Sequence, residues 1–187
     1  TEAVGYLKGR AWPQTESVPY FVMRDLLSSC FQIDDGDPLA VARSKLTAGL
    51  SEVLGKELGE EATAFIGQLI GFDFRHSRWI THIAEDSRQI RGRAEVLLRE
   101  WLARLCAEGA VVLLLEDLHW ADEESLALLS DILSESQPWR LCVVGLVRPL
   151  FWEREVRWGQ TGTEEPVAHH QWLNLEPLSD ELAGELA

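Results

Sequence analysis

Two adjacent carboxylates follow a short, wholly apolar stretch in the second half of the sequence. Residues 111–115 read Val-Val-Leu-Leu-Leu, and Glu116 and Asp117 come directly after them. Such a run is typical of a buried strand in a parallel sheet, and the ligands of these sheets bind at the carboxyl ends of the strands. One carboxylate there can hold Mg²⁺ through its waters, and the next can orient or deprotonate a water that attacks a phosphate. An acidic helix-capping loop after a core strand explains the same residues equally well.

A basic side chain ends the next apolar stretch. Residues 141–147 read Leu-Cys-Val-Val-Gly-Leu-Val, and Arg148 and Pro149 follow. At the same sheet edge as the two acids, Arg148 could sense or stabilise a terminal phosphate. For Arg148 alone, an ordinary surface arginine that pairs with nearby acids is the slightly better explanation. The two strand ends considered together favour a functional site.

The spacing of apolar residues predicts the elements that would position these side chains. Helices are predicted over residues 21–31, 39–54, 60–70, 88–108 and 123–134, the last with Asp122 as its N-cap. Strands are predicted over residues 4–8, 111–115, 141–147 and 172–175, whereas residues 71–87 show no clear pattern. Strand, helix and strand with short connections predict an α/β fold with a parallel sheet.

Composition and charge exclude several classes of function. The 187 residues are 46% hydrophobic, which is enough for a sizeable core, and 17 basic against 31 acidic residues give 17 − 31 = −14. A surface this acidic repels phosphate backbones, so nucleic acid and anionic membranes are not expected as partners of this segment. The longest strongly apolar run, 110–115, is far shorter than the ~20 residues of a membrane helix, and residues 1–12 do not resemble a signal peptide. Three widely spaced cysteines fit reduced thiols and a cytoplasmic location.

The string Glu116–Asp122 (EDLHWAD) resembles the Walker B region of the STAND branch of AAA-like ATPases. It is similar to the module found beside class III adenylate cyclase domains, and in LuxR-type regulators, in bacterial signalling proteins. Three further stretches carry the resemblance over nearly the whole chain. They are Gly9–Ala11 with residues 19–27, Arg148–Phe151 with Trp158-Gly159, and Leu173–Ser179.

The resemblance implies a role for each of the three candidate site residues. Glu116 would hold Mg²⁺ through water, Asp117 would be the water-activating acid, and Arg148 would be the sensor 1 arginine. ATP and Mg²⁺ are the implied cofactors. One departure concerns sensor 1, because Leu146 stands where the family often has a threonine that makes a polar contact.

The larger departure is the lack of a Walker A motif in this sequence. The nearest match is Gly49–Glu57, but its glycines are one residue too far apart, and Glu57 replaces the required Ser or Thr. We therefore interpret this stretch as a helix end. In the family, the P-loop precedes the element that corresponds to residues 4–8, so we expect it before Thr1. The lack of an initiating Met agrees with this expectation.

The resemblance also implies an architecture. Residues 1–177 would form a P-loop NTPase core of the ASCE/STAND type that is incomplete at its N-terminus, with a mostly helical insertion over residues 21–109. Residues 178–187 would begin a helical lid. The implied partners are the upstream P-loop segment, whose absence we expect to impair the folding of residues 1–187 alone, and downstream helical or repeat domains.

Two classes of function follow from the resemblance. In the first, ATP binding and slow hydrolysis switch the packing of this core against downstream domains and so regulate a cyclase or a transcriptional activator. The ATPase activity would belong to the full-length protein, and residues 1–187 alone would be inactive. The alternative is a scaffold that keeps the fold without turnover, which Leu146 and the missing P-loop favour. Direct DNA binding is disfavoured by the charge.

Overall fold

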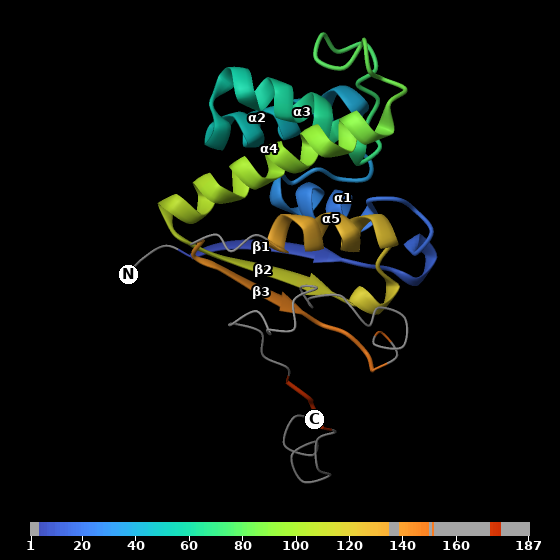
Figure 1. Cartoon of the computed structure of the whole chain (residues 1–187), viewed down its shortest axis with the longest axis vertical. Helices are drawn as coiled ribbons and strands as arrows, with labels where there is room; N and C mark the ends of the chain where they lie inside the picture. The colour runs from blue at the N-terminus through green and yellow to red at the C-terminus, as the bar shows by residue number, and fades with distance from the viewer. Residues whose placement is uncertain (1–3, 135–138, 150, 152–172, 177–187) are drawn as a thin grey trace. The chain divides into compact units, whose positions relative to one another are not determined.

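The computed structural model describes residues 4–134, 139–149, 151 and 173–176, and the chain divides into two compact units, residues 1–156 and 157–187. The described part of the first unit is a parallel sheet with helices (Figure 1). Its elements in chain order are β1 (Val4–Arg10), α1 (Phe21–Cys30), α2 (Leu39–Leu54), α3 (Lys56–Leu69), α4 (Ser87–Glu108), β2 (Ala110–Glu116), α5 (Glu123–Ser134) and β3 (Leu141–Gly145). The prediction of an α/β fold is confirmed.

The sheet has the order β1-β2-β3, and both pairs of strands are parallel. The register places Arg10 of β1 opposite Glu116, the last residue of β2. β3 ends at Gly145, whereas the sequence predicts that it continues to Val147. Backbone pairing nevertheless continues, because the Leu146 N–H donates to Leu115 O at 2.8 Å. The central strand β2 therefore presents its acidic end between the ends of its two neighbours.

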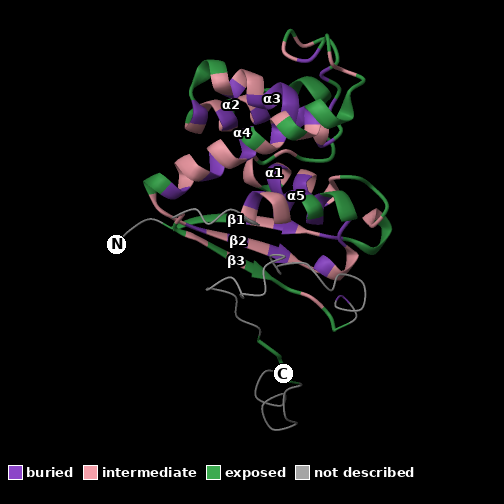
Figure 2. Cartoon of the chain, in the orientation of Figure 1, coloured by how far each residue is buried: buried purple, intermediate pink, exposed green. Residues whose placement is uncertain are grey.

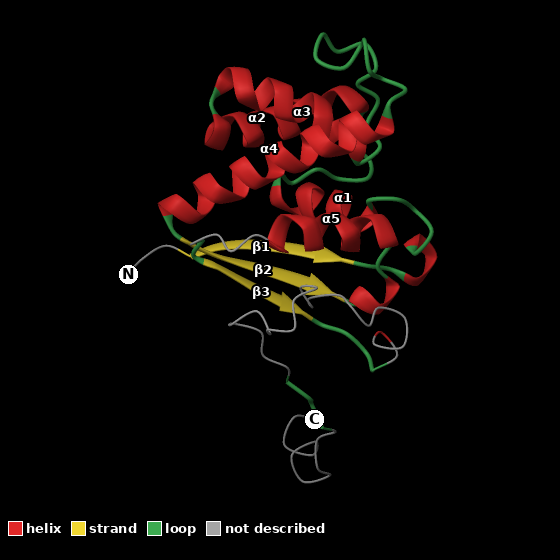
Figure 3. Ribbon diagram, in the orientation of Figure 1, coloured by secondary structure: helices red, strands yellow, loops and turns green. Residues whose placement is uncertain are grey.

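The two faces of the sheet differ in exposure. Helices α1 and α5 lie over one face (Figure 3), where Leu113 and Leu115 of β2 are at most 2% exposed. Strands β1 and β3 carry exposed residues, which are green in Figure 2. On the other face of the sheet, Tyr6 is 59% and Val144 is 39% exposed. Because side chains alternate along a strand, three charged residues near the ends of β1 and β2 share this second face. They are Lys8, Arg10 and Glu116.

Helix α1 packs closely on β1 and fixes the end of that strand. A Cβ at Gly9 would lie 3.0 Å from the Leu26 Cβ, so a side chain there would push the helix away. The backbone N–H of Arg10 donates to Asp25 Oδ2 of α1 at 2.8 Å. Burial raises the pKa of the Asp25 carboxyl, although this hydrogen bond opposes the effect. The backbone of Arg10 is thus held at its place beside the end of β2.

Most helix predictions are confirmed. Helices α2 and α5 match their predicted ranges, and α1 and α4 each differ by one residue at one end. Helix α3 begins at Lys56 and not at Glu60 as predicted, because Gly55 (φ 81°) alone forms the turn after α2. The carbonyl oxygen of Gly55 already accepts the first helical hydrogen bond, from the Gly59 N–H at 2.8 Å. Residues 71–86, which gave no clear pattern, form turns except for short irregular segments.

The stretch Gly49–Glu57 contains the end of α2, as the sequence predicts, and also the start of α3, which the sequence places later. Gly49 lies inside α2, where a Cβ would clash with the Phe31 ring. Glu57 lies in the first turn of α3. A Walker A loop needs several residues between its strand and its helix, whereas Gly55 alone separates α2 from α3.

The predicted strand over residues 172–175 is wrong over its described part. Residues 173–176 have no regular structure, and Leu173 and Leu175 are 76% and 88% exposed. Alternating leucines favour a strand only where a neighbouring strand and a covered face stabilise them, and these two residues have little burial. Trp172 and residues 178–187, where the sequence predicts the start of a lid, lie outside the described residues.

Neither a membrane-spanning helix nor a disulfide occurs in the described part of the chain. None of its helices combines the length and the apolar character needed to cross a bilayer. Cys30, Cys106 and Cys142 are free thiols. Burial raises the pKa of the Cys30 thiol to about 11, so this thiol is protonated and unreactive at neutral pH.

Candidate functional site

The acidic end of β2 carries the two predicted carboxylates. Glu116 is the last residue of the strand, and Asp117 turns the chain with a left-handed backbone (φ 54°, ψ 34°). Aspartate tolerates this conformation better than most residues, because its short side chain can form local hydrogen bonds. A 3₁₀ turn over Leu118–Trp120 follows, in which the Trp120 N–H donates to Asp117 O at 2.9 Å. The turn therefore holds Asp117 at the tip of the central strand.

Strand β1 supplies a cation to each acid. Lys8 Nζ lies 2.9 Å from Glu116 Oε2. Arg10 donates from Nε at 2.9 Å and from a terminal nitrogen at 2.8 Å, both to Asp117 Oδ2. The hydrogen bond to Glu116 raises the pKa of the Lys8 ammonium, which therefore remains charged at neutral pH. The Arg10 guanidinium also stacks on the Trp12 ring at 4.4 Å from its centroid.

Sequence reasoning missed Lys8 and Arg10 as site residues. Their alternation at the end of a predicted strand was visible, but their role depends on the register, which places β1 beside the acidic end of β2. Neither the apolar pattern of β1 nor the Walker B-like string shows that β1 pairs with β2. The pairing also has a chemical consequence, because each acid already has a cationic partner before any metal ion binds.

Arg148 lies beyond the end of β3 and is exposed. Its carbonyl oxygen accepts from the Phe151 N–H at 2.9 Å, and Phe151 is 1% exposed, so a turn anchors this segment. Within the described residues no ion pair joins Arg148 to Glu116 or Asp117. The structure thus brings the two acids to one sheet edge and leaves Arg148 near it without direct contact.

The charges of an acidic and a basic candidate residue both act on His119, two positions after Asp117. Burial lowers the pKa of its imidazole, the charge of Arg148 lowers it further, and Asp117 opposes both effects. The ring also stacks at a tilt on Trp120, with 5.1 Å between the ring centroids. His119 is therefore neutral at pH 7, and its side chain senses the charges of Asp117 and Arg148 together.

Replacing His119 by Gln is expected to weaken the acid sensitivity of folding. A pKa that is lower in the folded state stabilises the protein above the unfolded value of about 6.5, and this stabilisation is lost as the pH falls through the folded pKa. Urea unfolding at pH 7, 6 and 5 would show the wild type losing more stability than the variant. Parallel pH profiles of the two proteins would contradict this assignment.

Asp122 is a buried acid that caps two helices. It is 1% exposed and accepts from the Ser125 N–H at 2.8 Å, which confirms it as the N-cap of α5. It also accepts from the Tyr20 N–H at 2.7 Å and the Val22 N–H at 3.3 Å at the start of α1. Sequence reasoning found the first role and missed the second, which joins residues about 100 positions apart. Asp122 therefore fixes the far end of the loop that carries Asp117.

The two carboxylates at the end of β2 fit the metal-binding part of a site for a metal–nucleotide complex. Two carboxylates at the end of a strand are suitable ligands for Mg²⁺, which keeps several waters and uses one or two protein carboxylates. Groups of three or more His, Cys, Asp or Glu that could hold a metal by themselves do not occur among the described residues. Most remaining ligands would therefore be waters and phosphate oxygens. The sequence has no Walker A motif, so the phosphate cradle would have to come from elsewhere.

One comparison with known proteins identifies the family of this chain. The sequence profile of the AAA ATPase domain matches residues 2–144, which span β1 to β3 and all the helices between them. The match ends before Arg148. A search of curated proteins and a search of solved structures gave no match. Since the profile covers most of the chain, this protein belongs to the AAA ATPase domain family.

Proposed function

We propose that this chain is part of a STAND-type signalling switch that binds and hydrolyses ATP and regulates an attached effector, either a cyclase or a transcription regulator. The observation that carries the proposal is the position of Glu116 and Asp117, at the carboxyl end of the central strand in a member of the AAA ATPase family. Parallel sheets bind their ligands at this edge.

Each candidate residue has a defined task in this proposal. Glu116 holds Mg²⁺ through water, Asp117 orients and deprotonates the attacking water, and Arg148 contacts the terminal phosphate. When bound, Mg²⁺ neutralises charge that develops on the phosphate oxygens. Lys8 has to share or release Glu116 for this, because its ammonium lies 2.9 Å from the carboxylate.

The phosphate cradle is proposed to come from outside residues 1–187. Among the described residues, β3 pairs with β2 alone. In the family the P-loop strand takes the place at the other edge of this strand, which supports a core over residues 1–177 that an upstream strand completes. Residues 178–187 would then begin the lid. Downstream helical or repeat domains would read the nucleotide state.

The location and the partners are proposed on charge and composition. The proposed location is the cytoplasm, where thiols such as the three free cysteines stay reduced. The net charge of −14 argues against direct binding of nucleic acid or of an anionic membrane by this segment. ATP, Mg²⁺ and the flanking parts of the full-length protein are thus the proposed partners.

A scaffold without turnover is the second candidate. Leu146 is 44% exposed at the position where the family often has a polar side chain, and Glu116 and Asp117 both already have cationic partners. A module with these features could keep the fold and lose hydrolysis. Nucleotide turnover by the full-length protein separates the two candidates.

The proposal is tested by the Mg²⁺ dependence of phosphate release from ATP by the full-length protein. Glu116→Gln should raise the Mg²⁺ concentration for half-maximal rate roughly tenfold, because the carboxylate that holds a metal-bound water is lost. Lys8→Met should lower it, because a competing cation is removed. Lys45→Met is the matched control, since Lys45 pairs with Asp37 at 2.7 Å far from this edge in the sequence. An unchanged Mg²⁺ requirement in both site variants would remove Glu116 from the metal site.

A further inference from the structure

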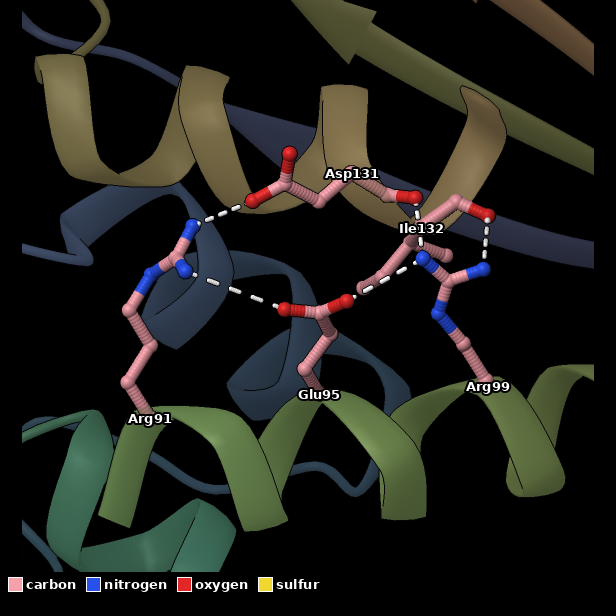
Figure 4. Close-up of polar contacts among 5 residues, drawn as sticks. All are labelled: Arg91, Glu95, Arg99, Asp131 and Ile132. Carbon is pink, nitrogen blue, oxygen red and sulfur yellow. Dashed lines mark hydrogen bonds and ion pairs between the residues drawn. The ribbon is translucent and has the colours of Figure 1, made fainter. Parts of the chain in front are cut away.

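A cluster of charged side chains joins α4 to α5. We name it the α4–α5 clamp and define it as Arg91, Glu95 and Arg99 of α4 with Asp131 of α5 (Figure 4). Arg91 pairs with Asp131 at 2.5 Å, and Glu95 lies 3.8 Å from Arg91 and 3.0 Å from Arg99. Arg99 also donates to the carbonyl oxygens of Asp131 and Ile132. Since the last carbonyls of a helix lack partners within it, Arg99 caps the C-terminal turn of α5.

The clamp continues to the loop that carries Asp117. Burial raises the pKa of the Tyr20 hydroxyl, and the nearby positive charge of Arg91 on α4 opposes this effect. The backbone N–H of Tyr20 donates to Asp122 Oδ1 at 2.7 Å. Tyr20 therefore lies between the end of the loop and Arg91 of α4. Helix α5 is therefore tied to α4 at its start through Asp122 and Tyr20, and at its end through Arg99.

Helix α4 also belongs to the helical unit, which we define as α2, α3 and α4 (Figure 1). It packs against α2 and α3 and also contacts β2 and α5. A core of buried side chains holds the unit together, all at most 2% exposed: Leu46, Leu50, Ile66, Leu97 and Trp101. Only Gly109 separates α4 from the start of β2. The unit can thus move as one body, and α4 is its connection to the candidate site.

We propose that the α4–α5 clamp couples the Asp117–Asp122 loop to the helical unit, so that nucleotide binding at the loop displaces the unit through α4. This inference rests on the proposed function, in which Asp117 engages the nucleotide. The clamp suits such a role because its side chains are partly exposed, 32% for Arg91 and 49% for Asp131. Exposed ion pairs contribute little to stability, so they can rearrange without unfolding the protein.

Arg104 provides a matched control on the same helix. It pairs with Glu100 at 2.7 Å, four residues earlier, as Arg99 pairs with Glu95. It donates to the carbonyl oxygens of Val53 and Leu54 at the end of α2, as Arg99 donates to those at the end of α5. The chemistry of the two arginines is the same, but Arg104 acts inside the helical unit and Arg99 acts between the unit and α5.

The test is hydrogen exchange of the full-length protein with and without saturating Mg·ATP. In the wild type, Mg·ATP should change the deuterium uptake of peptides from α2 and α3. In Arg99→Met and Asp131→Asn, which are first shown to fold by thermal melting, this change should become at least about threefold smaller. Arg104→Met should respond like the wild type.

The outcomes separate the coupling from the function on which it rests. If calorimetry shows that the wild type does not bind Mg·ATP, the proposed function fails and the coupling fails with it. If the wild type binds Mg·ATP but α2 and α3 do not respond, the coupling alone is overturned. A full response in both clamp variants, or an equal loss in Arg104→Met, would also overturn it.

Discussion

Replacing Asp117 by Asn is expected to slow ATP hydrolysis by the full-length protein at least about 100-fold, while the Kd for Mg·ATP changes less than about threefold. Asparagine keeps the shape and an acceptor oxygen for Arg10, which donates at 2.8 and 2.9 Å. It cannot take a proton from water at neutral pH. Phosphate release and calorimetric binding measured on the same preparation would show the loss in kcat alone.

Asp73→Asn is the matched control for this variant. Asp73 forms a similar pair, with Arg75 at 2.9 Å, but it lies in the turn region after α3. Its replacement should leave turnover unchanged. Turnover by Asp117→Asn at the wild-type rate would remove Asp117 from the mechanism and would favour another base.

Replacing Asp122 by Ala is expected to lower the free energy of unfolding by about 3 kcal/mol. Three backbone N–H groups would lose their buried acceptor: those of Tyr20, Val22 and Ser125. Asp122→Asn should cost less, because an amide oxygen in place of Oδ1 can still accept from Tyr20 and Ser125. Urea unfolding of the three proteins would give the differences.

An exposed N-cap provides the comparison for Asp122. Asp86 caps α4 and accepts from the Gln89 N–H at 3.1 Å, so Asp86→Ala removes one cap from one helix. Its effect should be clearly smaller than that of Asp122→Ala. Equal losses in the two variants would show that the contacts of Asp122 with the start of α1 add nothing to stability.

The sequence predicts the central part of the fold well because the signals there are local. The apolar run before Glu116 is short and uninterrupted, which is typical of a buried strand, and Asp122 stands where an N-cap acceptor is needed. Both signals can be recognised within about ten residues. The same holds for α2, whose apolar positions recur at helical spacing from Leu39 to Leu54.

The remaining features depend on neighbours that local patterns do not specify. Lys8 and Arg10 become site residues only when the register of β1 against β2 is known. The second role of Asp122 requires that α1 start beside α5. The α4–α5 clamp likewise joins side chains 40 positions apart, Arg91 and Asp131. Tertiary contacts of this kind determine much of the candidate site.

The most direct test of the central claim is a calorimetric titration of the full-length protein with ATP, with and without Mg²⁺. We expect saturable binding that Mg²⁺ strengthens, and no binding by residues 1–187 alone, because this sequence has no Walker A motif. Absence of nucleotide binding by the full-length protein would contradict the account. It would instead favour a scaffold built on the AAA ATPase fold.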